Sequence, residues 1–154
     1  MKIAVAADHA AVDMKDEVVR YLKELGHKVD DLGPFNKDRV DYPDYAARAC
    51  DLLVKDEVDR VVLICGSGIG MAMSANKVPG CRAALVHDAW EAEMCRRHNN
   101  ANVACFGARS QGIEIVTSSL KVFLESGFDG GRHAGRVAKM SKMDGSGVNE
   151  LPGE

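Results

Sequence analysis

The sequence predicts an α/β protein built as a three-layer α/β/α sandwich around a five-stranded parallel sheet. Short runs of apolar and β-branched residues alternate with longer amphipathic stretches along most of the chain, which is the pattern of repeated βα units. The length of 154 residues is enough for one buried core. The net charge is −3 and the basic residues are scattered, so we expect no nucleic-acid partner and no membrane-binding patch.

Five apolar runs are expected to form strands, and they cover residues 2–7, 28–32, 60–65, 82–86 and 102–106. Helices are expected between and after these strands, over about residues 11–25, 41–53, 69–77, 89–98 and 111–125. Gly26 closes the first helix, Pro43 opens the second, and Pro79 follows the third. This alternation predicts a Rossmann-like parallel sheet with helices on both faces.

The most informative segment is the 65–70 turn, Cys-Gly-Ser-Gly-Ile-Gly, which follows directly on an apolar strand. Its alternate glycines let backbone N–H groups approach an anion closely, and a helix beginning near Ile69 would add the positive end of its dipole. A cysteine at this junction is biased toward the thiolate, which is its reactive form. The alternative is a buried cysteine at the end of a strand, beside a tight turn.

Parallel βα units place the carboxyl ends of all strands at one edge of the sheet, where ligands bind. Polar residues follow four of the expected strands there, namely Asp8-His9, the 65–70 turn, His87-Asp88 and Arg109. We therefore expect function at this edge, provided that the first strand lies beside the third.

Cysteine usage indicates a reducing compartment. The five cysteines are an odd number without a C-x-x-C pair, which argues against a disulfide framework and a structural zinc site. Cys95 and His98 lie three apart on an expected helix, but the sequence shows no third ligand, so we expect no metal. The first seven residues are too short for a signal peptide and no apolar run approaches a membrane span, so a cytoplasmic location is expected.

The chain changes character after Gly127. Arg132 and Arg136 stand four apart, so on a helix both would project from one face and could clamp a phosphate, whereas a solvated basic face is the alternative. Val137 and Met140 form an apolar edge that the core does not need, so we expect this extra C-terminal helix to pack on a partner subunit. Residues 1–143 are taken as the domain and 144–154 as a mobile tail.

Several separated motifs resemble those of the type B ribose-5-phosphate isomerases, a family that includes allose-6-phosphate and galactose-6-phosphate isomerases. The motifs are Asp8-His9, Asp41-Tyr42-Pro43, the 65–70 turn, Ala75-Asn76-Lys77, Arg97-His98-Asn99, and Gly130-Gly131-Arg132-His133 with Arg136. The resemblance covers about residues 1–140. It implies that residues 1–143 form a sugar-phosphate isomerase domain, which interconverts an aldose phosphate and a ketose phosphate without metal or organic cofactor.

The resemblance also implies roles for individual residues. Cys65 would move a proton between C1 and C2 through an enediolate, Ser67 would relay protons, and His98 would open the furanose ring. Substrate binding is implied for a second set, namely Asp8, His9, Gly66, Gly68, Ile69, Gly70, Asn99, Arg109, Arg132 and Arg136. In this set the backbone amides of the turn would hold the enediolate oxygens, Asp8 and Asn99 would hold sugar oxygens, and His9 with the three arginines would hold the phosphate.

In this family the histidine and some arginines come from the partner subunit, so a homodimer with shared active sites, or a tetramer, is implied. The sequence departs from the family pattern at Ala10-Ala11 and Asn100, and Trp90 is bulky in a segment that approaches the sugar in the family. We therefore expect a pentose phosphate substrate, with tetrose or hexose phosphates as alternatives. A non-catalytic sugar-phosphate-binding protein is a further alternative, although binding alone would need neither Cys65 nor His98.

Overall fold

The computed structural model describes residues 1–145 and contains one sheet of five parallel strands. The strands are β1 (Lys2–Ala7), β2 (Lys28–Asp31), β3 (Arg60–Cys65), β4 (Ala83–Leu85) and β5 (Val103–Gly107). Their order across the sheet is β2-β1-β3-β5-β4, so the first strand lies beside the third, as expected. Ala7 pairs with Ile64, and Cys65 pairs with Gly107, which aligns the carboxyl ends of the three central strands.

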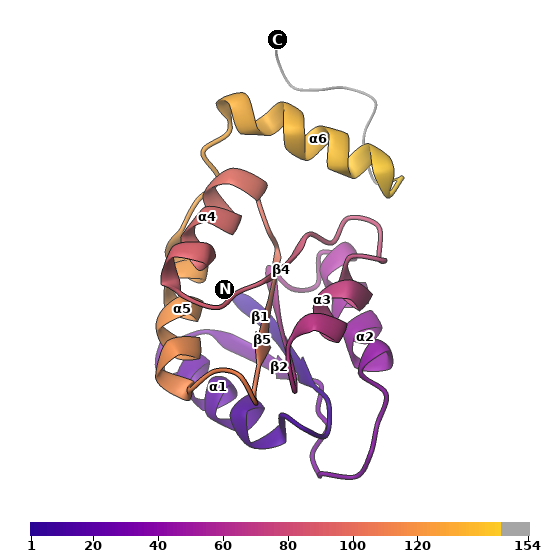
Figure 1. The fold of residues 1–154 in the computed structure, drawn as a ribbon, viewed down its shortest axis with the longest axis vertical. Coiled ribbons are helices and arrows are strands. Elements are labelled where there is room, and N and C mark those ends of the chain that lie inside the picture. The colour runs from indigo at the N-terminus through magenta and orange to yellow at the C-terminus, as the bar shows by residue number, and fades with distance from the viewer. Residues whose placement is uncertain (146–154) are drawn as a thin grey trace.

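Helices cover both faces of the sheet, which confirms the three-layer sandwich (Figure 1). One face carries α1 (Val12–Glu24), α4 (Ala89–Asn99) and α5 (Ile113–Glu125), and the other carries α2 (Tyr42–Val54) and α3 (Ile69–Ala75). Each helix follows a strand and returns to the opposite edge, as parallel βα units require.

The strands are buried on both faces, which is why they are continuous apolar runs rather than alternating ones. In β1, Ile3 and Val5 point toward α1 and α5, whereas the small side chains Ala4 and Ala6 point toward α2. Helix α2 packs against this face with small side chains of its own. Its buried residues are the predicted ones, Ala46, Ala49, Cys50 and Leu53. Cys50, Cys81 and Cys105 are buried in the core and form no disulfide.

Several element ends differ from the expected ones by one or two residues, and near two of these elements a side chain bonds to the backbone. Strand β4 is shorter than residues 82–86, and the Asn76 amide makes two 2.9 Å hydrogen bonds with the backbone of Ala83 at the free edge of this strand. Helix α5 begins at Ile113 because Gln111 is used elsewhere. Its side chain accepts from the Gly107 N–H and donates to the Val86 carbonyl, which ties β5 to the end of β4.

The C-terminal segment forms a 3₁₀ turn, η1 (Gly131–His133), followed by α6 (Ala134–Met143). The expectation that Arg132 and Arg136 share one helix face is wrong in detail, because α6 begins two residues after Arg132. Helix α6 crosses one end of the sandwich above α4 and α3 and has no buried residue (Figure 1). Most of the expected tail, residues 146–154, lies outside the described residues. No helix within residues 1–145 has the length and apolarity needed to cross a membrane.

Candidate active site

The carboxyl edge of the sheet gathers the first group of predicted site residues. Asp8 and His9 follow β1, the 65–70 turn follows β3, and Arg109 follows β5. Because β1, β3 and β5 are neighbours, these three segments lie side by side. The order of the parallel strands is therefore enough to bring the residues of this first group together.

In the turn after β3, a backbone amide points at the sulfur of Cys65. Sγ of Cys65 accepts a hydrogen bond from the Gly68 N–H at 3.1 Å, and Cys65 is buried with 5 % of its surface exposed. Gly68 has φ +77°, and a Cβ there would lie 2.5 Å from the Leu85 side chain and 2.9 Å from the Phe106 carbonyl carbon. Glycine is therefore required at position 68 by both conformation and space. The Cys65 sulfur is thus held at the start of the glycine turn by a backbone donor.

Arg109 lies across the same turn. Its backbone N–H donates to the Gly66 carbonyl at 2.9 Å, and a Cβ on Gly66 would be 3.5 Å from the Arg109 guanidinium. The guanidinium is exposed and makes no hydrogen bond or ion pair within the part of the chain that the structure describes. An uncompensated cation beside a turn of backbone amides suits an anionic ligand.

Asp8 and His9 are held by backbone contacts. Asp8 is buried, and its carboxylate accepts from the Ala10 N–H at 2.9 Å. Nδ1 of His9 lies 3.3 Å from both the backbone nitrogen and the carbonyl oxygen of Val40, so this ring nitrogen is held by the backbone of residue 40.

Two supporting contacts were not assigned a role from the sequence. The Oγ of Ser67 accepts from the Ile69 N–H at 3.3 Å, which steadies the turn. The ring of Tyr42 covers Gly70, because a Cβ on Gly70 would lie 2.7 Å from that ring. Gly70 is thus required for packing against Tyr42. The sequence analysis did not connect Tyr42 with Gly70, because no spacing rule relates these two positions.

The second group of predicted residues lies on the opposite side of the sheet, where the amino ends of the strands are. Helix α4 starts after β4 and runs back for 11 residues, a length of about 16 Å. His98 and Asn99 are at its far end, and Arg132 belongs to η1, which is joined to the same end. The predicted site is therefore divided, and one chain does not bring His98 to Cys65.

A compact polar cluster surrounds His98. Its ring stacks on the ring of His133, with centroids 4.2 Å apart and planes 8° from parallel. Nε of Arg97 bonds both carboxylate oxygens of Asp129, at 3.1 and 3.2 Å, and this guanidinium lowers the pKa of Asp129. Burial, with the positive charges of His98, Arg132 and Arg136, lowers the pKa of His133.

His98, Asp129 and His133 also form the kind of group that can hold a metal, with ligand atoms within 4.8 Å of one another. The sequence had suggested Cys95 with His98 and no third ligand, whereas the Cys95 thiol instead donates to the Ala92 carbonyl. Because the two rings are parallel and stacked, one ion cannot lie in both ring planes, and Arg97 already occupies Asp129. The observed arrangement is therefore poorly suited to a cation.

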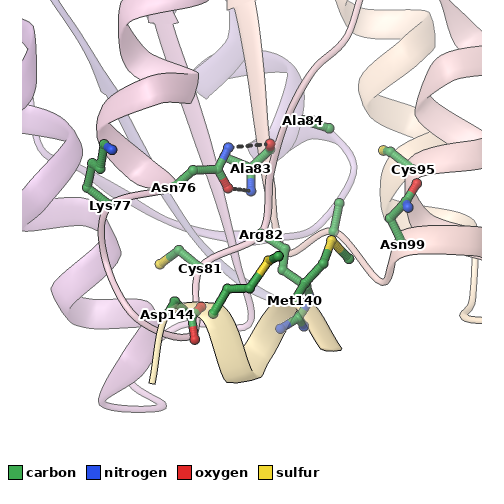
Figure 2. Close-up of a pocket in the computed structure, with 12 residues that line it drawn as sticks. Asn76, Lys77, Cys81, Arg82, Ala83, Ala84, Cys95, Asn99, Met140 and Asp144 are labelled. Carbon is green, nitrogen blue, oxygen red and sulfur yellow. Dashed lines mark hydrogen bonds between the residues drawn. The ribbon is translucent and has the colours of Figure 1, made fainter. Parts of the chain in front are cut away.

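A cavity of about 640 Å³ opens under α6, between the α3–β4 connection and the end of α4 (Figure 2). Asn99 lines it, together with Met140 and Asp144 from the C-terminal segment. Cys65 does not line it. Asn76 of the Ala75-Asn76-Lys77 motif points to Ala83 rather than to a ligand, as the dashed bonds in Figure 2 show.

The polar residues after β4 serve the fold instead of the site. Asp88 caps α4 by accepting from the Glu91 N–H at 2.8 Å, and His87 pairs with the Glu91 carboxylate at 3.0 Å. Strand β4 is parallel to β5, so its carboxyl end lies on the same side of the sheet as the other three, and these two side chains make local contacts with α4 there. Trp90 beside them is 68 % exposed.

Comparison with known proteins identifies the family and the fold. Residues 3–140 match the family described as Ribose/Galactose Isomerase. The chain is 43 % identical to a putative sugar phosphate isomerase of Bacillus subtilis, over 94 % of this chain and 97 % of that protein. It is 37 % identical to ribose-5-phosphate isomerase B of Escherichia coli, over 93 % and 96 % of the two chains. The solved ribose-5-phosphate isomerase B of Clostridium thermocellum superposes with a TM-score of 0.93 at 38 % identity, covering 94 % of this chain and 98 % of that one.

The fold and these matches define the class as sugar phosphate isomerases, which are intramolecular oxidoreductases. This chain belongs to the ribose/galactose isomerase family.

Proposed function

We propose that this protein interconverts ribose 5-phosphate and ribulose 5-phosphate, with Cys65 as the base. The observation that carries the proposal is the hydrogen bond from the Gly68 N–H to the Cys65 sulfur, at the strand ends where the Arg109 guanidinium lies beside the same turn. A thiolate beside backbone amides and cations is what proton abstraction next to a carbonyl requires.

The proton transfer balances within the substrate. The Cys65 thiolate takes the C2 proton of the open-chain aldose, and the C2–H electron pair forms the enediolate double bond as the carbonyl π electrons move to O1. Return of a proton to C1 and loss of the O2 proton give the ketose and restore the thiolate. Backbone amides of the 65–70 turn would hold the enediolate oxygens, and Ser67 would relay the proton between O1 and O2.

The other half of the site would come from a second copy of the chain. His98 and Asn99 lie at the amino edge of the sheet, whereas Cys65 lies at the carboxyl edge. Strand β4 is at the edge of the sheet. A two-fold axis beside it and perpendicular to the strands would bring the carboxyl ends of the strands in one copy next to the amino ends in the other. His98 of the second copy would then open the sugar ring, and its Arg132 and Arg136 would join His9 and Arg109 around the phosphate.

The outer surface of α3 fits such an interface. Ile69 and Met73 are 50 % and 67 % exposed there, and they line an apolar hollow with Leu85 of β4. Helix α6 also exposes apolar side chains, and 88 % of Met143 is accessible. Exposed apolar surface beside a divided site supports a self-complementary contact. A Met73→Glu variant should dissociate and lose activity together, as measured by analytical ultracentrifugation and isomerase assay.

Solvent exchange tests the proposed function. Ribose 5-phosphate in deuterated water should gain deuterium at C2 when it is incubated with the wild-type protein, and should gain none with the Cys65→Ala variant. Cys95→Ala is the matched control, since its thiol donates to the Ala92 carbonyl on α4, away from the 65–70 turn. A panel of tetrose, pentose and hexose phosphates measured for ketose formation identifies the preferred sugar. Binding of such a sugar without any exchange would instead support a non-catalytic binding protein.

A further inference from the structure

We propose that His133 is a positioning residue for His98. Its imidazole holds the His98 ring by stacking, so that His98 presents a fixed nitrogen to the ring oxygen of the sugar. This inference rests on the proposed function, because it assigns the orientation of the group that would open the furanose. It concerns a residue of the 3₁₀ turn η1 for which no role was inferred from the sequence.

The stack is the contact that fixes the His98 ring. His98 is on the last turn of α4, where helices fray, and its ring makes no hydrogen bond within residues 1–145. The two rings are 4.2 Å apart and within 8° of parallel, so their flat faces are in contact. Without this neighbour the His98 side chain could change rotamer.

His133 is itself firmly held. It has 8 % of its surface exposed, and its backbone N–H donates to the Gly130 carbonyl at 3.0 Å. Nε of Arg132 donates to Nε2 of His133 at 3.4 Å, which requires an unprotonated Nε2. The lowered pKa of His133, caused first by burial and then by the nearby positive charges, agrees with a neutral ring.

An ion pair ties the two histidines to one another. Asp129 donates its backbone N–H to the Arg97 carbonyl at 3.0 Å, and its carboxylate accepts two bonds from Nε of Arg97. Arg97 precedes His98 on α4, and Asp129 leads into the turn that carries His133. The clamp therefore joins the two segments at the turn where the rings meet.

The consequence for the reaction is geometric. Acid–base catalysis needs the donor nitrogen within hydrogen-bond reach of the sugar oxygen, and small displacements reduce the rate strongly. A neutral His133 supplies a flat surface and leaves the exchangeable proton to His98. What matters is thus the shape of the ring at position 133, and not its nitrogens.

The experiment compares His133→Ala, which removes the stack, with His133→Phe, which keeps a flat ring. His87→Ala is the matched control, because His87 lies on the surface at the other end of α4. Two reactions are measured for each variant. Conversion of ribose 5-phosphate requires ring opening, whereas release of label from C1-deuterated ribulose 5-phosphate does not, because that ketose cannot close a furanose ring.

We expect His133→Ala to lower kcat for ribose 5-phosphate by about tenfold or more and to leave the label release within about twofold of wild type. His133→Phe should retain ribose 5-phosphate conversion within about threefold. The proposal is overturned if His133→Phe falls as far as His133→Ala, or if both reactions fall equally. Proton NMR of the unliganded protein should show cross-relaxation between the two rings, and its absence also overturns the proposal. A wild-type protein that shows the stack but converts no sugar phosphate refutes the proposed function instead.

Discussion

Cys65 lies at the carboxyl ends of the strands, whereas His98 lies at their amino ends, because α4 follows β4 and runs back along the sheet. Cys65 terminates β3 in a turn that directs an amide at its sulfur. His98 ends α4 against the ring of His133. If both act on one sugar, two chains must meet.

Gly68→Ala should destabilise the protein and impair catalysis. A side chain at φ +77° is strained, and its Cβ would press on Leu85 and the Phe106 backbone. We expect a loss of about 2 to 4 kcal/mol in the free energy of unfolding from the combined strain and crowding. Gly127→Ala is the control, because nothing lies within 4 Å of a Cβ there. Urea denaturation measures the free energy of unfolding of both variants. An unchanged value for Gly68→Ala would contradict the close packing of Gly68 against Leu85 and Phe106.

Arg109→Gln should weaken binding of the phosphate group. Its guanidinium is exposed beside Gly66, so we expect KM for the sugar phosphate to rise about threefold to tenfold, with a smaller change in kcat. Arg20→Gln, on the surface of α1, should leave both constants unchanged. Steady-state kinetics at two salt concentrations would show a reduced salt dependence for Arg109→Gln. Equal effects of the two variants would contradict a role for Arg109.

Stability should depend on pH through His133. Because its pKa is lowered in the folded protein, the unfolded chain binds the proton at a higher pH. Protonation therefore favours unfolding, and stability that is complete above pH 6.5 is lost as the pH falls toward the folded-state pKa. His133→Phe should lose less stability than wild type between about pH 7.5 and about pH 5.5. Urea titrations at one protein concentration test this, and parallel losses in both proteins would count against it.

The sequence predicted the sheet well where both ends of an element carry strong signals. The limits of β1 and β3 match the expected residues because each is an apolar run bounded by polar residues, and the buried stripe of α2 follows from its spacing. The start of α5 differs from the expected one because the Gln111 side chain bonds to the backbone of Val86, which is 25 residues away in the sequence. No local pattern reports such contacts.

The candidate site shows the same division. Parallel topology sufficed to bring Asp8 and Arg109 to Cys65, since strand ends share an edge. The place of His98 relative to Cys65 depended on a family resemblance, because helix periodicity does not say which edge of which chain is met. The contact of His98 with His133 could not be predicted, since it depends on the Arg97–Asp129 ion pair that folds the segment back.

Complementation between two inactive variants tests the shared site most directly. Cys65→Ala and His98→Ala chains, co-expressed with different affinity tags and purified through both, form mixed dimers with one intact site. We expect such dimers to have about half of wild-type activity, while each variant alone has almost none. Mixed dimers of Cys65→Ala with a Cys65→Ala/His98→Ala chain should stay inactive. If the first mixture also stays inactive, Cys65 and His98 of different chains do not form one active site.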